Sequence, residues 1–256
     1  MLISYIAHEA KKLISDSVFA NLIRAFGISL FGIFVDLIKE RNLRVSLIAG
    51  STSQAGQDAF ALNFSSIRTK GRFLELGAGH PLLNSNTYHL ERDFCWSGVS
   101  VDSSREFEMI WKHARNCNLI INPVEKIDWL NFFKTYGRTW NYLQIDINSG
   151  SQAYELMKNL VFSGGIFETI TFEHDSYVSG QAKEFADRTI EFLSAHEYKL
   201  VAKNVKHRGR SFEDWWVHKD VQSNNKFQLR DGIEGKRNFS IKSRILDLLL
   251  SGHRAL

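Results

Sequence analysis

From Lys70 onward the chain alternates short apolar segments with stretches of helical periodicity. The apolar segments are short and commonly end at a glycine or an acidic residue, as at Gly77, Asp102 and Asp146. In the intervening stretches, apolar residues recur mostly every three or four positions, which indicates helices with one buried face. Strands that alternate with helices imply a mainly parallel sheet covered on both faces. The pattern therefore predicts an α/β fold.

The periodicity predicts seven strands, five helices in the main domain and three regions. The expected strands are Arg72–Leu76, Gly98–Val101, Leu119–Ile121, Tyr142–Ile145, Phe167–Phe172, Tyr198–Val205 and Asp214–Val217. The expected helices of the main domain are Thr87–Phe94, Phe107–Asn116, Ile127–Tyr136, Ala153–Leu160 and Ala182–His196. We expect a helical extension over residues 1–50, a main domain over 51–222, and a basic tail with a short helix over 223–256.

The N-terminal extension has three possible roles. Its apolar residues recur at helical spacing over residues 2–40, and Gly27 and Gly32 divide the pattern. The helices could pack on the main domain, join two copies into a homo-oligomer, or lie on a membrane surface. The longest apolar stretch, Ala25–Val35, has 11 residues, whereas a membrane span needs ~20. No transmembrane segment is therefore expected.

Targeting signals and cysteine content favour the cytoplasm. The chain starts MLISYIAHEAKK, where the charges follow the apolar residues, the reverse of the order in a secretory signal. Cys95 and Cys117 are the 2 cysteines of the chain, so disulfides do not hold this fold. A reducing compartment fits this composition best.

The net charge of +4 is unevenly distributed. Residues 199–256 carry 13 basic and 6 acidic side chains, whereas the preceding residues carry 19 basic and 22 acidic ones. Such a basic region can bind nucleic acid, an anionic membrane or an anionic substrate, or it can be an ordinary solvated face. Charge alone does not decide among these.

The first two strands end in residues suited to a nucleoside. Gly77 and Gly79 follow the first strand, where glycines let the backbone approach a ligand closely. Asp102 ends the second strand, and a carboxylate at this position accepts hydrogen bonds from ribose hydroxyls. Asp102 could instead cap the helix that follows. The absence of GxGxxG argues against a dinucleotide site.

Acidic residues and a histidine follow two later strands. Asp146 comes after the fourth strand, and Glu173, His174 and Asp175 come after the fifth. Neighbouring strand ends bring such residues into one pocket. Asp146, His174 and Asp175 offer the ligands that Mg²⁺ or Mn²⁺ prefers, or His174 could act as a general base. Each residue taken singly could also be an ordinary loop or capping residue.

Several segments in order resemble the FkbM-type methyltransferase family over about residues 53–220. They are SQAGQD (53–58), FLELGAGHPLLNSNTYHLER (73–92), YLQID (142–146), ITFEHDSY (170–177) and FEDWWVH (212–218). The resemblance implies a class I methyltransferase fold, which is a Rossmann-like, seven-stranded sheet. It also implies dependence on S-adenosylmethionine (SAM).

The resemblance also implies a set of cofactor-binding residues. They are Gln54, Gln57, Glu75, Gly77, Ala78, Gly79, Ser85, Asn86, Asp102 and Asn122. The sequence departs from the family at Asn122-Pro123, where many members have Asp-Ala. It departs again after Asp146, where the family's Glu has no counterpart in Ile147-Asn148-Ser149-Gly150.

The resemblance implies an O-methyltransferase acting on a sugar hydroxyl of a glycan or glycosylated metabolite. Asp146, His174 and Asp175 would activate the hydroxyl, either by holding a divalent metal or with His174 as the base. Trp216, His218 and His207 are candidates to line the acceptor pocket. The basic excess predicts that the acceptor or its carrier is anionic.

Three other functions stay open. The chain could be a catalytically silent binding subunit with this fold. It could methylate a non-sugar acceptor such as a small phenol or nucleic acid, although no N/DPPY-type motif follows the fourth strand and we expect no stable nucleic-acid partner. A nicotinamide-dependent oxidoreductase is the third alternative, against which the missing GxGxxG counts.

Overall fold

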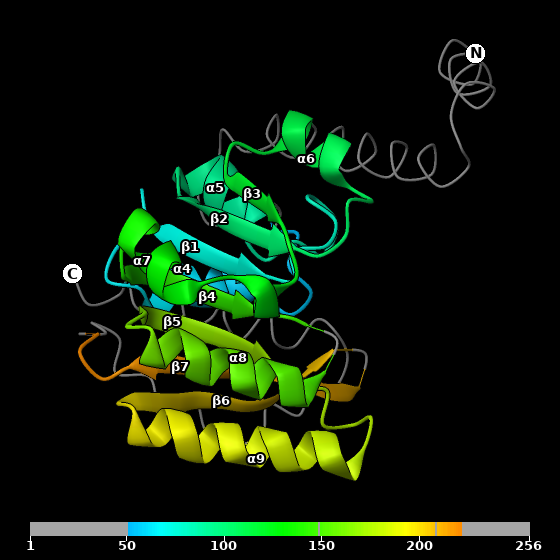
Figure 1. Ribbon diagram of the computed structural model, residues 1–256, viewed down its shortest axis with the longest axis vertical. Helices are drawn as coiled ribbons and strands as arrows, with labels where there is room; N and C mark the ends of the chain where they lie inside the picture. The colour runs from blue at the N-terminus through cyan, green and yellow to red at the C-terminus, as the bar shows by residue number, and fades with distance from the viewer. Residues whose placement is uncertain (1–50, 148, 208, 222–256) are drawn as a thin grey trace, which may run out of the picture. The chain divides into compact units, whose positions relative to one another are not determined.

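The structure is a computed structural model that describes residues 51–147, 149–207 and 209–221. The helices expected in residues 1–50 and the basic tail lie outside these residues. In the described part, seven strands form one sheet in the order β3-β2-β1-β4-β5-β7-β6 (Figure 1). The strands are β1 (Arg72–Leu76), β2 (Ser97–Asp102), β3 (Asn118–Ile121), β4 (Thr139–Ile145), β5 (Ile166–Glu173), β6 (Tyr198–His207) and β7 (Arg210–His218).

The direction of the strands decides which residues meet at one edge of the sheet. β7 pairs antiparallel with β5 and β6, and the other neighbouring strands pair in parallel. The first residues of β7 therefore lie at the edge where β1 to β5 end. This topology confirms the predicted seven-stranded, mostly parallel class I methyltransferase fold.

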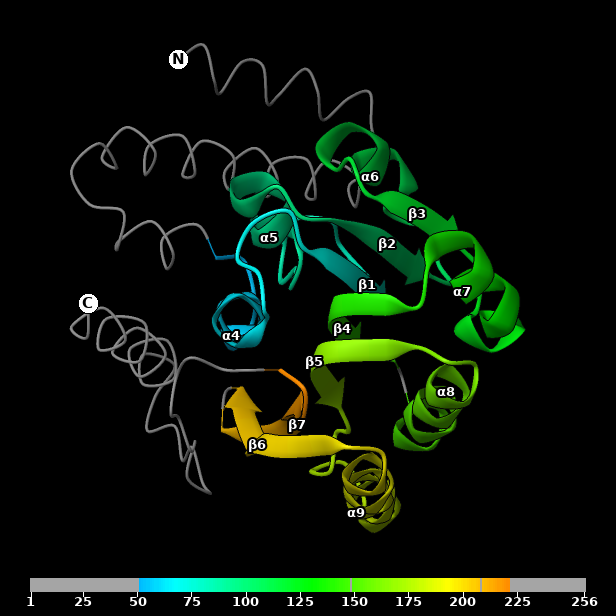
Figure 2. The same cartoon turned by 90° about the vertical axis from the view of Figure 1, so that its left-hand side faces the viewer.

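Helices cover both faces of the sheet. α4 (Gln57–Phe64), α5 (Tyr88–Phe94) and α6 (Glu108–Ala114) lie on one side, and α7 (Trp129–Tyr136), α8 (Gly150–Phe162) and α9 (Gly180–Ala195) lie on the other (Figure 2). The Asp128 side chain caps α7 by accepting a hydrogen bond from Asn131 N at 3.1 Å. Such caps satisfy N–H groups that have no partner within the helix.

The two faces of the sheet differ in chemistry. The face under α7, α8 and α9 carries the larger apolar core, which includes Leu74, Leu143 and Trp216. On the opposite face, Phe60 of α4 stacks on Trp215 with ring centroids 4.8 Å apart. This second face also buries many polar side chains, among them Glu75, Tyr142, Gln144, Thr171 and Glu213. Because side chains alternate along a strand, each strand supplies both layers.

The observed elements extend the predicted ones at several ends. β4, β5 and β7 are longer than predicted, and α8 begins at Gly150 rather than Ala153. α4 was not predicted, because all eight of its residues are buried and the helix shows no apolar periodicity. Within the described ranges, no helix is long and apolar enough to cross a membrane.

Candidate functional site

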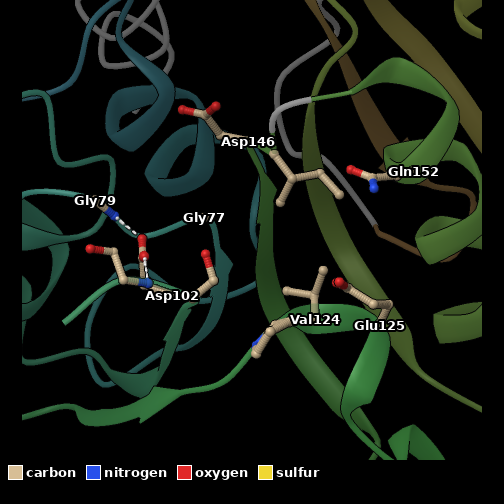
Figure 3. A pocket seen from close by; sticks show the side chains of 11 residues that line it. Gly77, Gly79, Asp102, Val124, Glu125, Asp146 and Gln152 are labelled. Atoms are coloured by element: carbon tan, nitrogen blue, oxygen red, sulfur yellow. Dashed lines mark hydrogen bonds between the residues drawn. The ribbon is translucent and has the colours of Figure 1, made fainter.

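A pocket of about 650 Å³ opens at the carboxyl edge of the sheet (Figure 3). It lies where β1, β2 and β4 end and where the chain leaves β3. Its lining residues are Gly77, Gly79, Asp102, Ser103, Ser104, Pro123, Val124, Glu125, Asp146, Ile147 and Gln152. The volume falls within the range of small-molecule and cofactor sites. The position is that of the ligand crevice in open α/β sheets.

Gly77 brings the end of β1 against the end of β4. Its φ is +82°, and a Cβ at this position would lie 1.6 Å from the carbonyl oxygen of Asp146. On the other side of this junction, Asp146 N donates to Leu76 O at 2.9 Å. Only glycine fits such a close approach of two backbones. In the structure, Gly77 is thus required by its contact with the end of β4, a cause other than the predicted approach to a ligand.

Asp102 faces the pocket with its carboxylate held by two backbone amides. Gly79 N donates to its Oδ2 and Ser104 N to its Oδ1, each at 2.7 Å (Figure 3). Two carboxylate oxygens offer about four acceptor positions, so these bonds leave room for donors from a ligand. Asp102 therefore caps the turn that follows β2 and can also bind vicinal hydroxyls.

Glu75 lies outside the pocket lining, in a buried network behind it. Its Oε2 accepts hydrogen bonds from Thr87 Oγ1 at 2.9 Å and Ser100 Oγ at 2.7 Å. Burial raises the pKa of Glu75, and the positive charge of Arg115 opposes this shift. Glu75 therefore acts on the loop after β1 through Thr87, whereas the resemblance implied a place in the cofactor loop.

Arg115 fastens the loop after β1 to the end of α6. Its Nη1 donates to Pro81 O at 3.0 Å and to Ser85 Oγ at 3.2 Å, and its Nη2 donates to Thr87 Oγ1 at 2.8 Å. The guanidinium also pairs with Glu91 at 2.7 Å and is almost fully buried. A planar group with five donors suits such a multiple contact. Ser85 is therefore part of a rigid loop rather than of the pocket lining.

The other predicted cofactor residues surround the pocket at different depths. Ala78 is buried, and its N donates to Val101 O at 3.1 Å. Asn86 is buried in the loop held by Arg115, and its Oδ1 has no hydrogen-bond partner among the described residues. Gln57 is buried at the start of α4, and Gln54 is half-buried before it. Asn122 is half-buried next to Pro123, a lining residue.

Asp146 forms a carboxyl–carboxylate pair with Glu173. The register of β4 and β5 places Ile145 opposite Phe172, so the next residues are neighbours at the strand ends. Burial raises the pKa of Asp146 to about 6, and a hydrogen bond with Glu173 opposes the rise. Burial and the charge of Asp146 raise the pKa of Glu173 to about 10. At neutral pH Glu173 therefore stays protonated, and its carboxyl O–H donates a hydrogen bond to the ionised Asp146 carboxylate.

Glu213 extends this acidic group onto β7. It lies opposite Glu173 in the strand register, and Trp215 Nε1 donates to its Oε1 at 2.6 Å. Burial raises the pKa of Glu213 to about 8, while the Trp215 hydrogen bond and the neighbouring Gln57 side chain lower it. Three strands thus place acidic side chains side by side near the pocket.

The burial of Glu213 predicts a pH-dependent cost in stability. Since its pKa is about 8 in the fold and about 4.3 in an unfolded chain, its contribution to stability is complete below that lower value and is lost as the pH rises towards 8. We expect Glu213→Gln to stabilise the protein at pH 8 by on the order of 2–4 kcal/mol, with little gain at pH 4. Urea unfolding at both pH values measures this, with the exposed Glu155→Gln as control. An equal difference at both pH values would contradict it.

His174 and Asp175 do not join Asp146 in one ligand set. The His174 side chain is buried, its Nδ1 accepts from Ser176 N at 3.0 Å, and its Nε2 lies 3.4 Å from Asp214 Oδ1. Asp175 lines a second pocket, whereas Asp146 lines the first. In the described part of the chain, no three His, Cys, Asp or Glu side chains are arranged to hold a metal ion. The predicted Mg²⁺ or Mn²⁺ site does not fit this geometry.

The predicted acceptor residues are spread over the sheet. Trp216 is buried in the larger core. His218 pairs with Tyr198 at the start of β6, at the edge of the sheet opposite the pocket, because β7 runs antiparallel. His207 ends β6 at the same edge of the sheet as the pocket, and its ring packs against Phe212 with ring centroids 6.0 Å apart. Of the three, the structure therefore places His207 alone at the carboxyl edge.

Glu173, Glu213 and Arg115 are site residues that the sequence interpretation did not select. Glu173 precedes the selected His174, and strand alternation turns neighbouring side chains to opposite faces. The register of β4 and β5 pairs Ile145 with Phe172, so the next residues, Asp146 and Glu173, are neighbours on one face. This register would have identified Glu173 instead of His174. Arg115 had no signal of its own, since it follows α6 in sequence and contacts a loop that lies some thirty residues earlier.

Sequence comparisons give no relatives, and structural comparisons give distant likenesses. A scan of protein-family models finds no match, and a search of curated proteins finds none. The cofactor-bound structure of Rv0187 from MTB is 15% identical, with a TM-score of 0.49 over 68% of this chain and 87% of that one. Human methyltransferase-like protein 13 in complex with S-adenosylhomocysteine (SAH) is 11% identical, with a TM-score of 0.42 over 78% of this chain and 90% of the other.

A third likeness is to fibrillarin of Aeropyrum pernix with bound SAM. It is 16% identical, with a TM-score of 0.39 over 63% of this chain and 76% of that one. Likenesses this distant add nothing to the residue geometry described above. The FkbM-type resemblance remains a prediction.

Proposed function

We propose that the protein is a SAM-dependent O-methyltransferase. The observation that carries this proposal is the pocket that joins Asp102 to Asp146 along the carboxyl edge of the sheet. Asp102 offers hydroxyl-binding capacity at one side (Figure 3), and Asp146, which is ionised at neutral pH, borders the same cavity. One cavity thus combines a nucleoside-binding group with a group that can remove a proton.

The residues present fit SAM as the cofactor. Asp102 would accept hydrogen bonds from the ribose hydroxyls, and the apolar side chains of Val124 and Ile147 would pack on the adenine. No atom lies within 4 Å of a Cβ built on Gly79, so its backbone leaves open space for a ligand. When bound, SAM would supply a methyl group on a sulfonium that leaves as a neutral thioether.

Asp146 is suited to be the general base for a hydroxyl acceptor. A hydroxyl is a weak nucleophile at neutral pH and needs a base to remove its proton. A base works best when its pKa lies near the working pH, and burial raises the pKa of Asp146 to about 6. Glu173 would hold the carboxylate in place by donating a hydrogen bond to it. This assignment uses Asp146 and replaces His174 as the base.

Asp102→Asn tests the nucleoside side of the pocket. The amide keeps one acceptor oxygen but loses the charge, so we expect SAH to bind about 10- to 100-fold more weakly, which corresponds to ~1.5–3 kcal/mol. Isothermal titration calorimetry measures the Kd. The exposed Glu155→Gln variant also removes one negative charge, on α8, and should bind SAH like the native protein. If NAD stabilises the native protein and SAH does not, the cofactor assignment is wrong.

We further propose a sugar hydroxyl as the acceptor, as the FkbM-type resemblance implies. Labelled methyl transfer from SAM to sugar nucleotides, free glycans and small phenols tests this class. Transfer to phenols alone would contradict the sugar proposal while leaving methyl transfer intact. SAH binding without transfer to any acceptor would favour the alternative of a catalytically silent subunit.

A further inference from the structure

Every charged side chain that lines the pocket at the carboxyl edge is acidic. The three are Asp102, Glu125 and Asp146, and the lining contains no lysine, arginine or histidine. They come from the end of β2, the turn after β3 and the end of β4, so three separate elements bring negative charge to one cavity (Figure 3). The charge of Asp102 is one cause of the raised pKa of Asp146, so these two carboxylates repel each other. A pocket of this kind attracts positive charge and repels phosphate groups.

Two buried amide oxygens add to the negative potential near this pocket. Gln144 precedes Asp146 by two residues, so strand alternation turns both side chains to the same face of the sheet. The Gln144 side chain is buried, and its Oε1 has no hydrogen-bond partner among the described residues. The same is true of Oδ1 of Asn86, in the loop after β1. A buried oxygen without a donor is costly, and a nearby positive charge lowers that cost.

The proposed function places the positive charge of the cofactor close to Asp146. A general base lies within about 2.6–3.2 Å of the oxygen whose proton it removes. That oxygen lies about 3–3.5 Å from the carbon that it attacks. The attacked methyl carbon is bonded directly to the sulfonium sulfur. Asp146 is therefore near enough to the sulfonium for direct attraction, and the lining holds no cation that would compete for its carboxylate.

The two charges disappear together in the proposed step. The acceptor oxygen bonds the methyl carbon, and the carbon–sulfur bond breaks with its electron pair left on sulfur as a neutral thioether. The hydroxyl proton passes to the Asp146 carboxylate, which becomes neutral as well. The attraction that holds SAM is thus absent from the complex with SAH until Asp146 returns its proton to water.

We propose that this pocket discriminates between SAM and SAH by charge, so that methyl transfer itself loosens the spent cofactor. Asp146 is the main determinant of this preference, and Glu125 adds a smaller part from the turn after β3. The inference rests on the proposed function and adds to it a mechanism of product release. It requires SAM to bind more tightly than SAH to the same protein.

The test is isothermal titration calorimetry of the full chain without an acceptor, so that no turnover occurs. The probes are SAM, SAH and sinefungin, which carries an amine in place of the methylated sulfur and is therefore also a cation. We expect SAM and sinefungin each to bind about tenfold or more tightly than SAH, because both place a positive charge beside Asp146.

Asp146→Asn keeps the shape of the side chain and removes its charge. It should weaken SAM and sinefungin about tenfold and leave the Kd of SAH nearly unchanged, which also shows that the variant is folded. Glu125→Gln should weaken the two cations about twofold, since its side chain is exposed and water screens its charge. Glu155→Gln removes an exposed charge of α8 outside the pocket lining and should change none of the three affinities.

Two results would overturn the inference. One is a native protein that binds SAH as tightly as SAM and sinefungin. The other is an equal loss of all three affinities in Asp146→Asn, which would give Asp146 a structural role only. A native protein that binds none of the three probes would instead overturn the proposed function.

Discussion

Replacing Gly77 with alanine is expected to destabilise the fold by roughly 3–5 kcal/mol, since the new methyl group would overlap the backbone where β1 meets β4. The Cβ would lie 1.6 Å from Asp146 O, and backbone atoms cannot move aside as a flexible side chain can. At this size the melting temperature should fall on the order of 10 °C. SAH binding should be lost in parallel, because both Gly77 and Asp146 line the pocket.

Gly79→Ala is the matched control for this substitution. Gly79 also has a positive φ, +55°, but a Cβ there would meet no atom within 4 Å. The control therefore carries the cost of the left-handed backbone, roughly 1–2 kcal/mol, without the collision. Thermal unfolding of both variants by circular dichroism separates the two causes. Equal losses of stability would show that backbone conformation, and not the contact with Asp146, decides the requirement for glycine.

Replacing Asp146 with asparagine is expected to lower kcat by about 10²- to 10⁴-fold, the usual contribution of a general base. The Kd of SAH should change little, because the substitution keeps the shape of the side chain. In the native protein, kcat should rise with pH to a plateau with an apparent pKa of about 6, since the ionised form of Asp146 is the active one. This acidic limb should disappear in the variant.

Glu173→Gln is the companion substitution for the Asp146 assignment. Glutamine can still donate a hydrogen bond to Asp146, so this variant should keep most of the activity. Methyl-transfer rates measured between pH 5 and 9 would provide the comparison. If Glu173→Gln were inactive and Asp146→Asn active, the base would be Glu173. An unchanged kcat in both variants would remove the carboxyl pair from the mechanism.

The fold could be predicted because each strand carries its own signal. The apolar segment ending at Leu76 and the one ending at Ile145 are buried strands whatever their neighbours are. α4 could not be found in this way, because a helix buried on all sides loses the periodicity that marks a surface helix. β7 was predicted only in part, since Arg210 and Ser211 extend it with polar residues that pair with the end of β6.

The candidate site could be predicted in its single residues but not in its pairings. Asp102 and Asp146 follow from the rule that ligands bind where parallel strands end, and both line the pocket. The register and direction of strand pairs are set between segments that are distant in sequence. The sequence therefore predicts His174 as the partner of Asp146, whereas the structure places Glu173 there. For the same reason His218 was expected near the acceptor, although an antiparallel strand carries it to the far edge.

The contact between Gly77 and Asp146 sets the distance between the turn after β1 and the end of β4. Main-chain atoms fix it, through the bond from Asp146 N to Leu76 O and the contact with the Gly77 backbone. The spacing between the turn after β1 and the proposed base is thus set by the backbone and not by side-chain packing. The side chains that line the second pocket come from α8, α9 and the loop after β5, which take no part in that junction. Substitutions among those side chains are therefore expected to leave the spacing between the turn after β1 and Asp146 unchanged.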